Sequence, residues 1–280
     1  MVMGPTHSMS GAAVWLVGTA VAASISPFNP TLSMVVLGAT VMAGAAIACD
    51  FDSNSATAVR SFGVMGTIVH QIVDGISVLV YNLTRTKYDK PRENGHRTLF
   101  HTGAMAIAIG AAVSALASIS GTVDILGKTF TYGQLFSLLV MFIMLHLGIA
   151  GLFEKQVKKM KKKVGVYGML LASFVITAIV GYALPENETF PWLGLCVGGG
   201  LIVHCMGDAI TKMGVPLLWP IKIKGKRWYD ITLPSFMRIK AGGKFEYVFL
   251  LPALTFITIG AALWHIPGAI ENVMDMTGVK

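Results

Sequence analysis

The chain has 280 residues, of which 54% are hydrophobic and 13% charged, and its formal net charge is +8. Charged residues make up about a quarter of an average soluble domain, so this composition excludes an ordinary soluble enzyme. Several apolar runs near 20 residues instead indicate an all-α polytopic membrane protein. We assign the positive charge to loops beside an anionic leaflet and expect membrane lipids, not nucleic acid, as partners. Cys49, Cys196 and Cys205 lie in or beside apolar segments and predict no disulfide framework.

The apolar runs predict one membrane domain over residues 1–280. Seven of them are expected to cross the membrane: 8–25, 31–48, 101–120, 133–153, 165–184, 191–211 and 247–265. Another run, 61–83, is interrupted by His70, Gln71 and Asp74, so we predict a re-entrant or interfacial helix there. The alternation within 221–246, followed in that segment by two adjacent glycines, predicts a small cytoplasmic β-hairpin inserted in the domain.

Three basic segments define the expected topology, namely 85–97, 155–163 and 222–244. By the positive-inside rule these segments face the cytoplasm. The span that starts near His101 then leaves the cytoplasm, and the span that holds His204 returns to it. With 61–83 not crossing, the N-terminus is cytoplasmic too. The sequence therefore predicts a multi-pass protein of the plasma (inner) membrane.

His204 and Asp208 are the most informative pair in the chain. They are four residues apart in an apolar run, which places them on one face of a helix. Both side chains are costly in hydrocarbon, so a polar partner, a water-filled cavity or a metal must accompany them. Gly214 and Pro216 then end the helix. A buried hydrogen-bonded pair that serves packing alone is the structural alternative.

Other polar groups are predicted to reach the same membrane face. Imidazoles and carboxylates without thiolates suit Zn²⁺, with Mn²⁺ or Fe²⁺ as alternatives, and enough ligands exist for one or two ions. The predicted metal ligands are His7, Asp50, Asp52, His101, His204 and Asp208. Of these, Asp52, His101, His204 and Asp208 are the expected primary ligands, while His7 and Asp50 complete a second site.

Three residues are assigned to the chemistry itself: Asp50, His96 and Arg97. His96 is expected either to bind metal or to transfer a proton. We predict that Thr98 caps the following helix, that His101 projects from its first turn, and that Arg97 holds a phosphate oxygen. Each piece has a structural alternative. His7 could be a surface residue, Asp50 and Asp52 a polar cap, and His96-Arg97 ordinary interfacial charge.

The order of these residues resembles that of the YdjM-like family, described as LexA-regulated, membrane-bound, predicted metal-dependent hydrolases of bacteria. The resemblance rests on His7, on Asp50-x-Asp52, on His96-Arg97-x-x-x-His101, and on His204-x-x-x-Asp208 followed by Gly-Val-Pro-Leu-Leu-Trp-Pro at 214–220. It covers about residues 4–222. The family is in turn distantly similar to zinc-dependent phospholipase C and P1-type nuclease. The resemblance implies hydrolysis of a phosphoester, with a phospholipid as one candidate substrate.

The sequence thus predicts a metal-dependent hydrolase that uses metal-activated water at the cytoplasmic face of the membrane. Two rivals remain. A transporter or metal-ion carrier would also use intramembrane His/Asp pairs, but its sites should lie near the midplane. A non-catalytic membrane protein would keep the same residues without turnover. The sequence does not indicate an oligomeric state.

Overall fold

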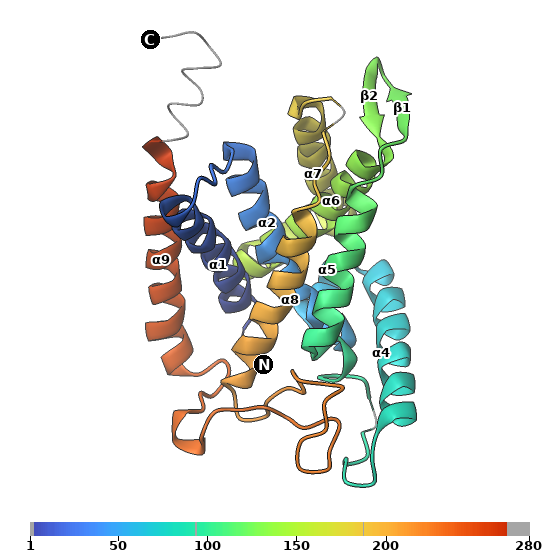
Figure 1. Cartoon of the computed structure of the whole chain (residues 1–280), viewed down its shortest axis with the longest axis vertical. Coiled ribbons are helices and arrows are strands. Elements are labelled where there is room, and N and C mark those ends of the chain that lie inside the picture. The colour runs from blue at the N-terminus through green and yellow to red at the C-terminus, as the bar shows by residue number, and fades with distance from the viewer. Residues whose placement is uncertain (1–2, 93, 187, 268–280) are drawn as a thin grey trace.

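The structure is a computed structural model and describes residues 3–92, 94–186 and 188–267 (Figure 1). The first half holds α1 (Gly4–Ile25), α2 (Leu32–Ala48), η1 (Cys49–Asp52), α3 (Thr57–Ser61), α4 (Val64–Thr84), η2 (Leu99–His101) and α5 (Gly103–Ala117). The second half holds β1 (Thr122–Ile125), β2 (Lys128–Thr131), α6 (Tyr132–Leu152), α7 (Glu154–Ala183), α8 (Leu193–Ala209), η3 (Ser235–Met237), η4 (Glu246–Leu250) and α9 (Leu251–Trp264).

The predicted all-helical membrane fold is confirmed. Six helices of the described part are long and apolar enough to cross a bilayer: Gly4–Ile25, Leu32–Asp52, Val64–Thr84, Tyr132–Leu152, Lys162–Ala183 and Glu246–Trp264. Two of the seven predicted crossings, α5 and α8, are shorter apolar helices of 15 and 17 residues. Conversely, α4 has the length and composition of a span and exposes apolar side chains such as Ile68 and Ile72. The non-crossing placement of 61–83 stays a prediction.

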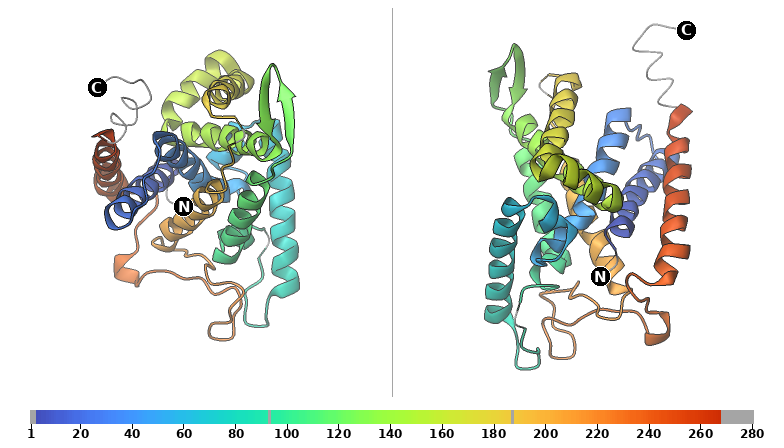
Figure 2. Two further views of the ribbon diagram at one scale, coloured as in Figure 1. Left: turned by 45° about the horizontal axis from the view of Figure 1, so that its top comes forward. Right: turned by 180° about the vertical axis from the view of Figure 1, so that it is seen from behind.

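Helix α2 lies at the centre of the bundle, packed by α1, α6 and α8, and α5 packs on the other side of α8 (Figures 1 and 2). Small residues make these close approaches possible. A Cβ atom on Gly44 would lie 2.0 Å from the carbonyl oxygen of Met144 in α6, and one on Gly200 would lie 2.6 Å from the Cβ of Ala45. The contact at Gly200 brings the end of α2, where Asp50 follows, beside the end of α8, where Asp208 lies.

The predicted β-hairpin at 221–246 is wrong in its position. The two-stranded antiparallel sheet consists of β1 and β2, paired from Thr122–Thr131 to Ile125–Lys128, at the opposite end of the bundle (Figure 1). Within 221–246 only isolated bridges form, such as Ile223–Lys226 around a turn at Gly225. The alternation was misleading because this segment pairs with neighbouring loops: Val215 bridges Ile231, and Thr211 bridges Ile239.

The lysine-rich segment 155–163, one of the three basic segments of the expected topology, is helical. It forms the first turns of α7, and the backbone of Gly165, with a φ of 72°, interrupts the helix. Residues other than glycine rarely adopt this conformation. The kink therefore lies only a few residues into the candidate span Lys162–Ala183 and separates the charged first turns of α7 from its apolar remainder.

Asp89 joins the loop after α4 to the segment before Asp230. Its carboxylate accepts hydrogen bonds from the Thr86 and Trp228 amides at 2.7 and 3.0 Å, and from the Arg227 amide at 3.3 Å. Burial raises the pKa of Asp89, but these hydrogen bonds, with one from the Thr86 hydroxyl, outweigh it and lower the pKa below its usual value.

We expect Asp89→Asn to destabilise this junction by about 1–3 kcal/mol, because the remaining amide group fits fewer of the N–H donors. Because the folded-state pKa of Asp89 is lowered, its contribution to stability is fully present above its unfolded-state pKa of about 4. That contribution is lost as pH falls through the folded-state pKa. Limited proteolysis of 221–230 from pH 7 to pH 3 measures this. A wild-type protein no more resistant than the variant at pH 7 would contradict the prediction.

Candidate metal centre

Four separate segments bring histidine and aspartate side chains to one end of the bundle. His7 comes from the first turns of α1, Asp50 and Asp52 from η1, His96 and His101 from the loop before α5, and His204 and Asp208 from the last turns of α8. All of these except His96 are buried, with His101, His204 and Asp208 fully so. The predicted convergence in space is therefore present. Their roles as ligands stay a prediction.

Four of these side chains bring imidazole nitrogens and carboxylate oxygens close together, and we call them the cage: Asp50, His101, His204 and Asp208. The Nε2 atoms of His101 and His204 are 3.1 Å apart. Asp50 Oδ1 lies 3.6 Å from His204 Nε2 and 4.0 Å from His101 Nε2. Asp208 Oδ2 lies 3.8 and 3.7 Å from the same two atoms. Donor atoms bonded to a tetrahedral Zn²⁺ at about 2.0–2.1 Å are ~3.3 Å apart. The separations between the donor atoms of the cage are therefore close to those around one such ion.

Polar contacts behind the cage fix how its imidazoles face inward. His204 Nδ1 lies 2.8 Å from the carbonyl oxygen of Ala46, which can only accept. The hydrogen is therefore on Nδ1, and Nε2 turns its lone pair into the cage. His101 Nδ1 lies 3.0 Å from Asp52 Oδ2. The Nδ1 atoms of both imidazoles are thus held from behind, and their Nε2 atoms face the cage.

Asp52 holds its neighbours in place and does not face the cage. Its Oδ1 accepts from His96 Nδ1 at 2.9 Å, and its Oδ2 accepts from the Arg97 amide at 3.1 Å. Asp50 is the aspartate whose Oδ1 reaches the cage, and this buried atom has no hydrogen-bond partner. The two carboxylates share one turn but point in different directions, Asp50 toward the cage and Asp52 toward the residues around it. The sequence predicts Asp52 as a primary ligand and Asp50 as part of a second site, and both assignments stay predictions.

His7 flanks the cage from α1. Its ring stacks on that of His204, with centroids 4.0 Å apart, and its Nε2 lies 3.6 Å from Asp208 Oδ1. A Cβ atom on Gly207 would lie 2.9 Å from the His7 ring, so the glycine makes this approach possible. Buried His7 Nε2 has no hydrogen-bond partner. His7, His204 and Asp208 form a second group with metal-binding spacing, beside the group of Asp50, Asp52, His96 and His101.

Two predictions about the loop before α5 need correction. Arg97 is buried and pairs with Asp208 at 2.8 Å, while its Nη1 donates to the Gly214 carbonyl, so it does not stand ready for a phosphate oxygen. The cap of α5 is Thr102, whose hydroxyl accepts from the Met105 amide, and not Thr98. His101 lies in η2, just before the helix and not in its first turn, because the chain turns once more at Arg97, with a φ of 55°.

His96 lies between the buried residues and the solvent-accessible surface. Its side chain is 23% exposed, and one nitrogen is held by Asp52. It lines a pocket of about 380 Å³ together with Arg92, Asn94, Arg97, Met213, Gly214 and Asp230. Arg92 donates to both oxygens of Asp230, at 2.9 and 3.1 Å, across this pocket's rim. Sequence reasoning missed this ion pair, since nothing in the spacing of residues 138 apart predicts it.

The remaining candidate groups are engaged in packing. His70 Nδ1 lies 2.9 Å from the Phe51 carbonyl, and Asp74 accepts from the Gly95 amide at 2.7 Å. They hold α4 against η1 and against the loop of His96. His146 lies 3.1 Å from both the Ser173 hydroxyl and the Ser61 carbonyl, so it links α6 to α7 and α3.

Residues 166–267 match the family model described as YdjM inner membrane protein. The YdjM-like resemblance is thus confirmed over the part that contains α8 with His204 and Asp208, while His7, Asp50 and His101 lie outside the match. The YdjM description and the apolar helices together indicate a membrane protein. No curated protein and no solved structure matches the chain. The distant likeness to phospholipase C and P1-type nuclease stays a prediction.

Proposed function

We propose that this protein is a membrane-bound, metal-dependent hydrolase that cleaves a phosphoester, with Zn²⁺ as the expected ion. The observation that carries the proposal is the cage: two imidazole Nε2 atoms 3.1 Å apart, facing carboxylate oxygens in a fully buried setting. Buried polar atoms are nearly always hydrogen-bonded. Asp50 Oδ1 and His7 Nε2 lack such partners here, and a divalent cation would satisfy the donor set.

We assign the residues of the site to metal binding, positioning and proton transfer. Asp50, His101, His204 and Asp208 would hold the ion, with His7 beside them, and Asp52 keeps His101 in its tautomer. A bound divalent ion would activate water and stabilise the developing charge on phosphate. His96, whose second nitrogen is turned away from Asp52 at the pocket, would exchange the proton with water or the leaving oxygen. Arg97 compensates the charge of Asp208, with which it forms an ion pair at 2.8 Å.

The position of the site supports an enzyme over a carrier. The cage is built from the ends of α2 and α8, with η1, η2 and the basic segments 85–92 and 222–244 at the same end of the molecule (Figure 2). A carrier needs a site near the midplane with access from both faces. By the positive-inside rule we also propose that this end, with the start of α1, faces the cytoplasm.

Metal analysis of the purified protein tests the proposal. Wild type is expected to hold stoichiometric metal and to hydrolyse a phosphodiester such as bis(p-nitrophenyl) phosphate, whereas His204→Ala with Asp208→Ala should lose both. The control is His265→Gln, a histidine that contacts Thr19 and Leu16 away from the cage. Metal kept in the double variant would refute the cage; metal bound without turnover on phosphodiesters or phospholipids would refute the hydrolase.

A further inference from the structure

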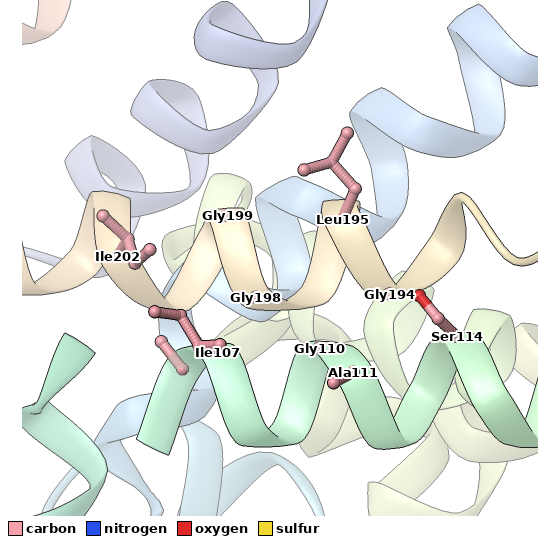
Figure 3. Close-up of a pocket in the computed structure, with 10 residues that line it drawn as sticks. Ile107, Gly110, Ala111, Ser114, Gly194, Leu195, Gly198, Gly199 and Ile202 are labelled. Atoms are coloured by element: carbon pink, nitrogen blue, oxygen red, sulfur yellow. The ribbon is translucent and has the colours of Figure 1, made fainter. Parts of the chain in front are cut away.

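An apolar groove runs between α5 and α8 on the outer surface of the bundle (Figure 3). Its volume is about 350 Å³, and its floor consists of Gly110, Gly194 and Gly198. At this floor the two backbones nearly touch, since a Cβ atom on Gly194 would lie 2.1 Å from the Gly110 carbonyl oxygen. Ile107 and Leu195, which are 66% and 68% exposed, stand along it. The groove is therefore open sideways, toward the hydrocarbon of a surrounding bilayer.

One end of the groove leads to the metal centre. Ile202 lies two residues before His204, and Ala106 lies five residues after His101. Along α8 the groove face continues from Ile202 to Met206, one turn nearer the cage and 58% exposed. Beyond the helix Met213, 67% exposed, lines the pocket of His96. Exposed apolar side chains thus continue from the groove toward the end of α8, on the side of the polar pocket.

The other end of the groove is closed. The Ser114 hydroxyl donates to the Pro191 carbonyl at 2.7 Å and ties α5 to the segment before α8. From Ala106 to Ser114 the groove follows α5 for about 12 Å at 1.5 Å per residue. A slot of this form, apolar, open to the bilayer and leading to a buried polar centre, fits a single extended hydrocarbon chain.

Building on the proposed function, we infer that the groove binds an acyl chain of a phospholipid whose phosphate lies at the pocket of His96. This names the substrate class of the hydrolase as a membrane phospholipid. The lipid enters from the side, through the bilayer, and its headgroup meets the basic loops 85–92 and 222–230, where Arg92 and Lys224 lie. Water reaches the phosphate through the pocket, while the chain stays in the groove.

Photo-cross-linking in vesicles tests the acyl-chain site without requiring turnover. The protein is placed in phosphatidylethanolamine vesicles with a phosphatidylglycerol that carries a diazirine in one acyl chain, and labelled peptides are mapped by mass spectrometry. Label is expected on 106–114 and 194–206. Ala111→Phe, which fills the groove, should reduce that label at least about tenfold, since one methylene in an apolar site is already worth ~10-fold or more.

Ala112→Phe is the matched control, because Ala112 is exposed on the same helix and does not line the groove. Its labelling should equal that of wild type, and both variants should keep the metal content that reports an intact fold. Label spread evenly over the exposed apolar faces of α4, α7 and α9, or unchanged by Ala111→Phe, would overturn the inference. Labelling needs no catalysis, so the experiment tests the acyl-chain site even if the protein cleaves no substrate. A failure of the proposed hydrolase activity is therefore distinguished from a failure of the acyl-chain site.

Discussion

His96→Ala is expected to keep its bound metal and to lose about 10²–10⁴-fold in turnover, the usual contribution of a positioned general acid or base. His96 is the one residue of the cluster that is partly exposed and lines the pocket, with a side chain 23% exposed. Its Nδ1 is held by Asp52 at 2.9 Å, so its other nitrogen is available for proton transfer. The cage atoms come from other residues, so removing the ring of His96 takes no donor atom out of the cage.

The measurement combines metal content with phosphodiester hydrolysis at saturating substrate. Met213→Ala is the matched control: Met213 lines the same pocket but carries no titratable group. Loss of metal in His96→Ala would make His96 a ligand, as the sequence also allowed. Turnover unchanged from wild type would remove it from the chemistry.

The helices could be predicted from the sequence because their signal is local. Each apolar run that we assigned forms a helix, and α8 ends at Ala209, close to the predicted stop at Gly214. The pairing of His204 with Asp208 follows from helical spacing alone. Even the convergence of distant segments could be anticipated, since buried polar groups in a membrane must find partners.

The roles within the cluster could not be predicted in the same way. Asp50 and Asp52 share a 3₁₀ turn, and only the contacts made by each carboxylate oxygen distinguish a cage residue from an orienting one. The sequence around Arg97 predicts a cation at the surface. Its position is determined instead by its ion pair with Asp208, which lies far along the chain. The strands were misplaced for a related reason: alternation in 221–246 reflects packing of a loop against α8 and its own neighbours, which no local pattern encodes.

Metal affinity should distinguish the two aspartates of η1. Asp52→Asn is expected to weaken Zn²⁺ binding about 10–100-fold, the usual effect of losing a residue that orients a metal-binding histidine. Asp50→Asn should weaken it more, because it removes a charged oxygen from the cage itself, 3.6 Å from His204 Nε2. Competition with a chelator of known affinity measures both, and Asp124→Asn on β1, at the opposite end of the bundle, is the control. If Asp52→Asn weakened Zn²⁺ binding more than Asp50→Asn, Asp52 would be the ligand. The metal site would then consist of η1 with His96 and His101.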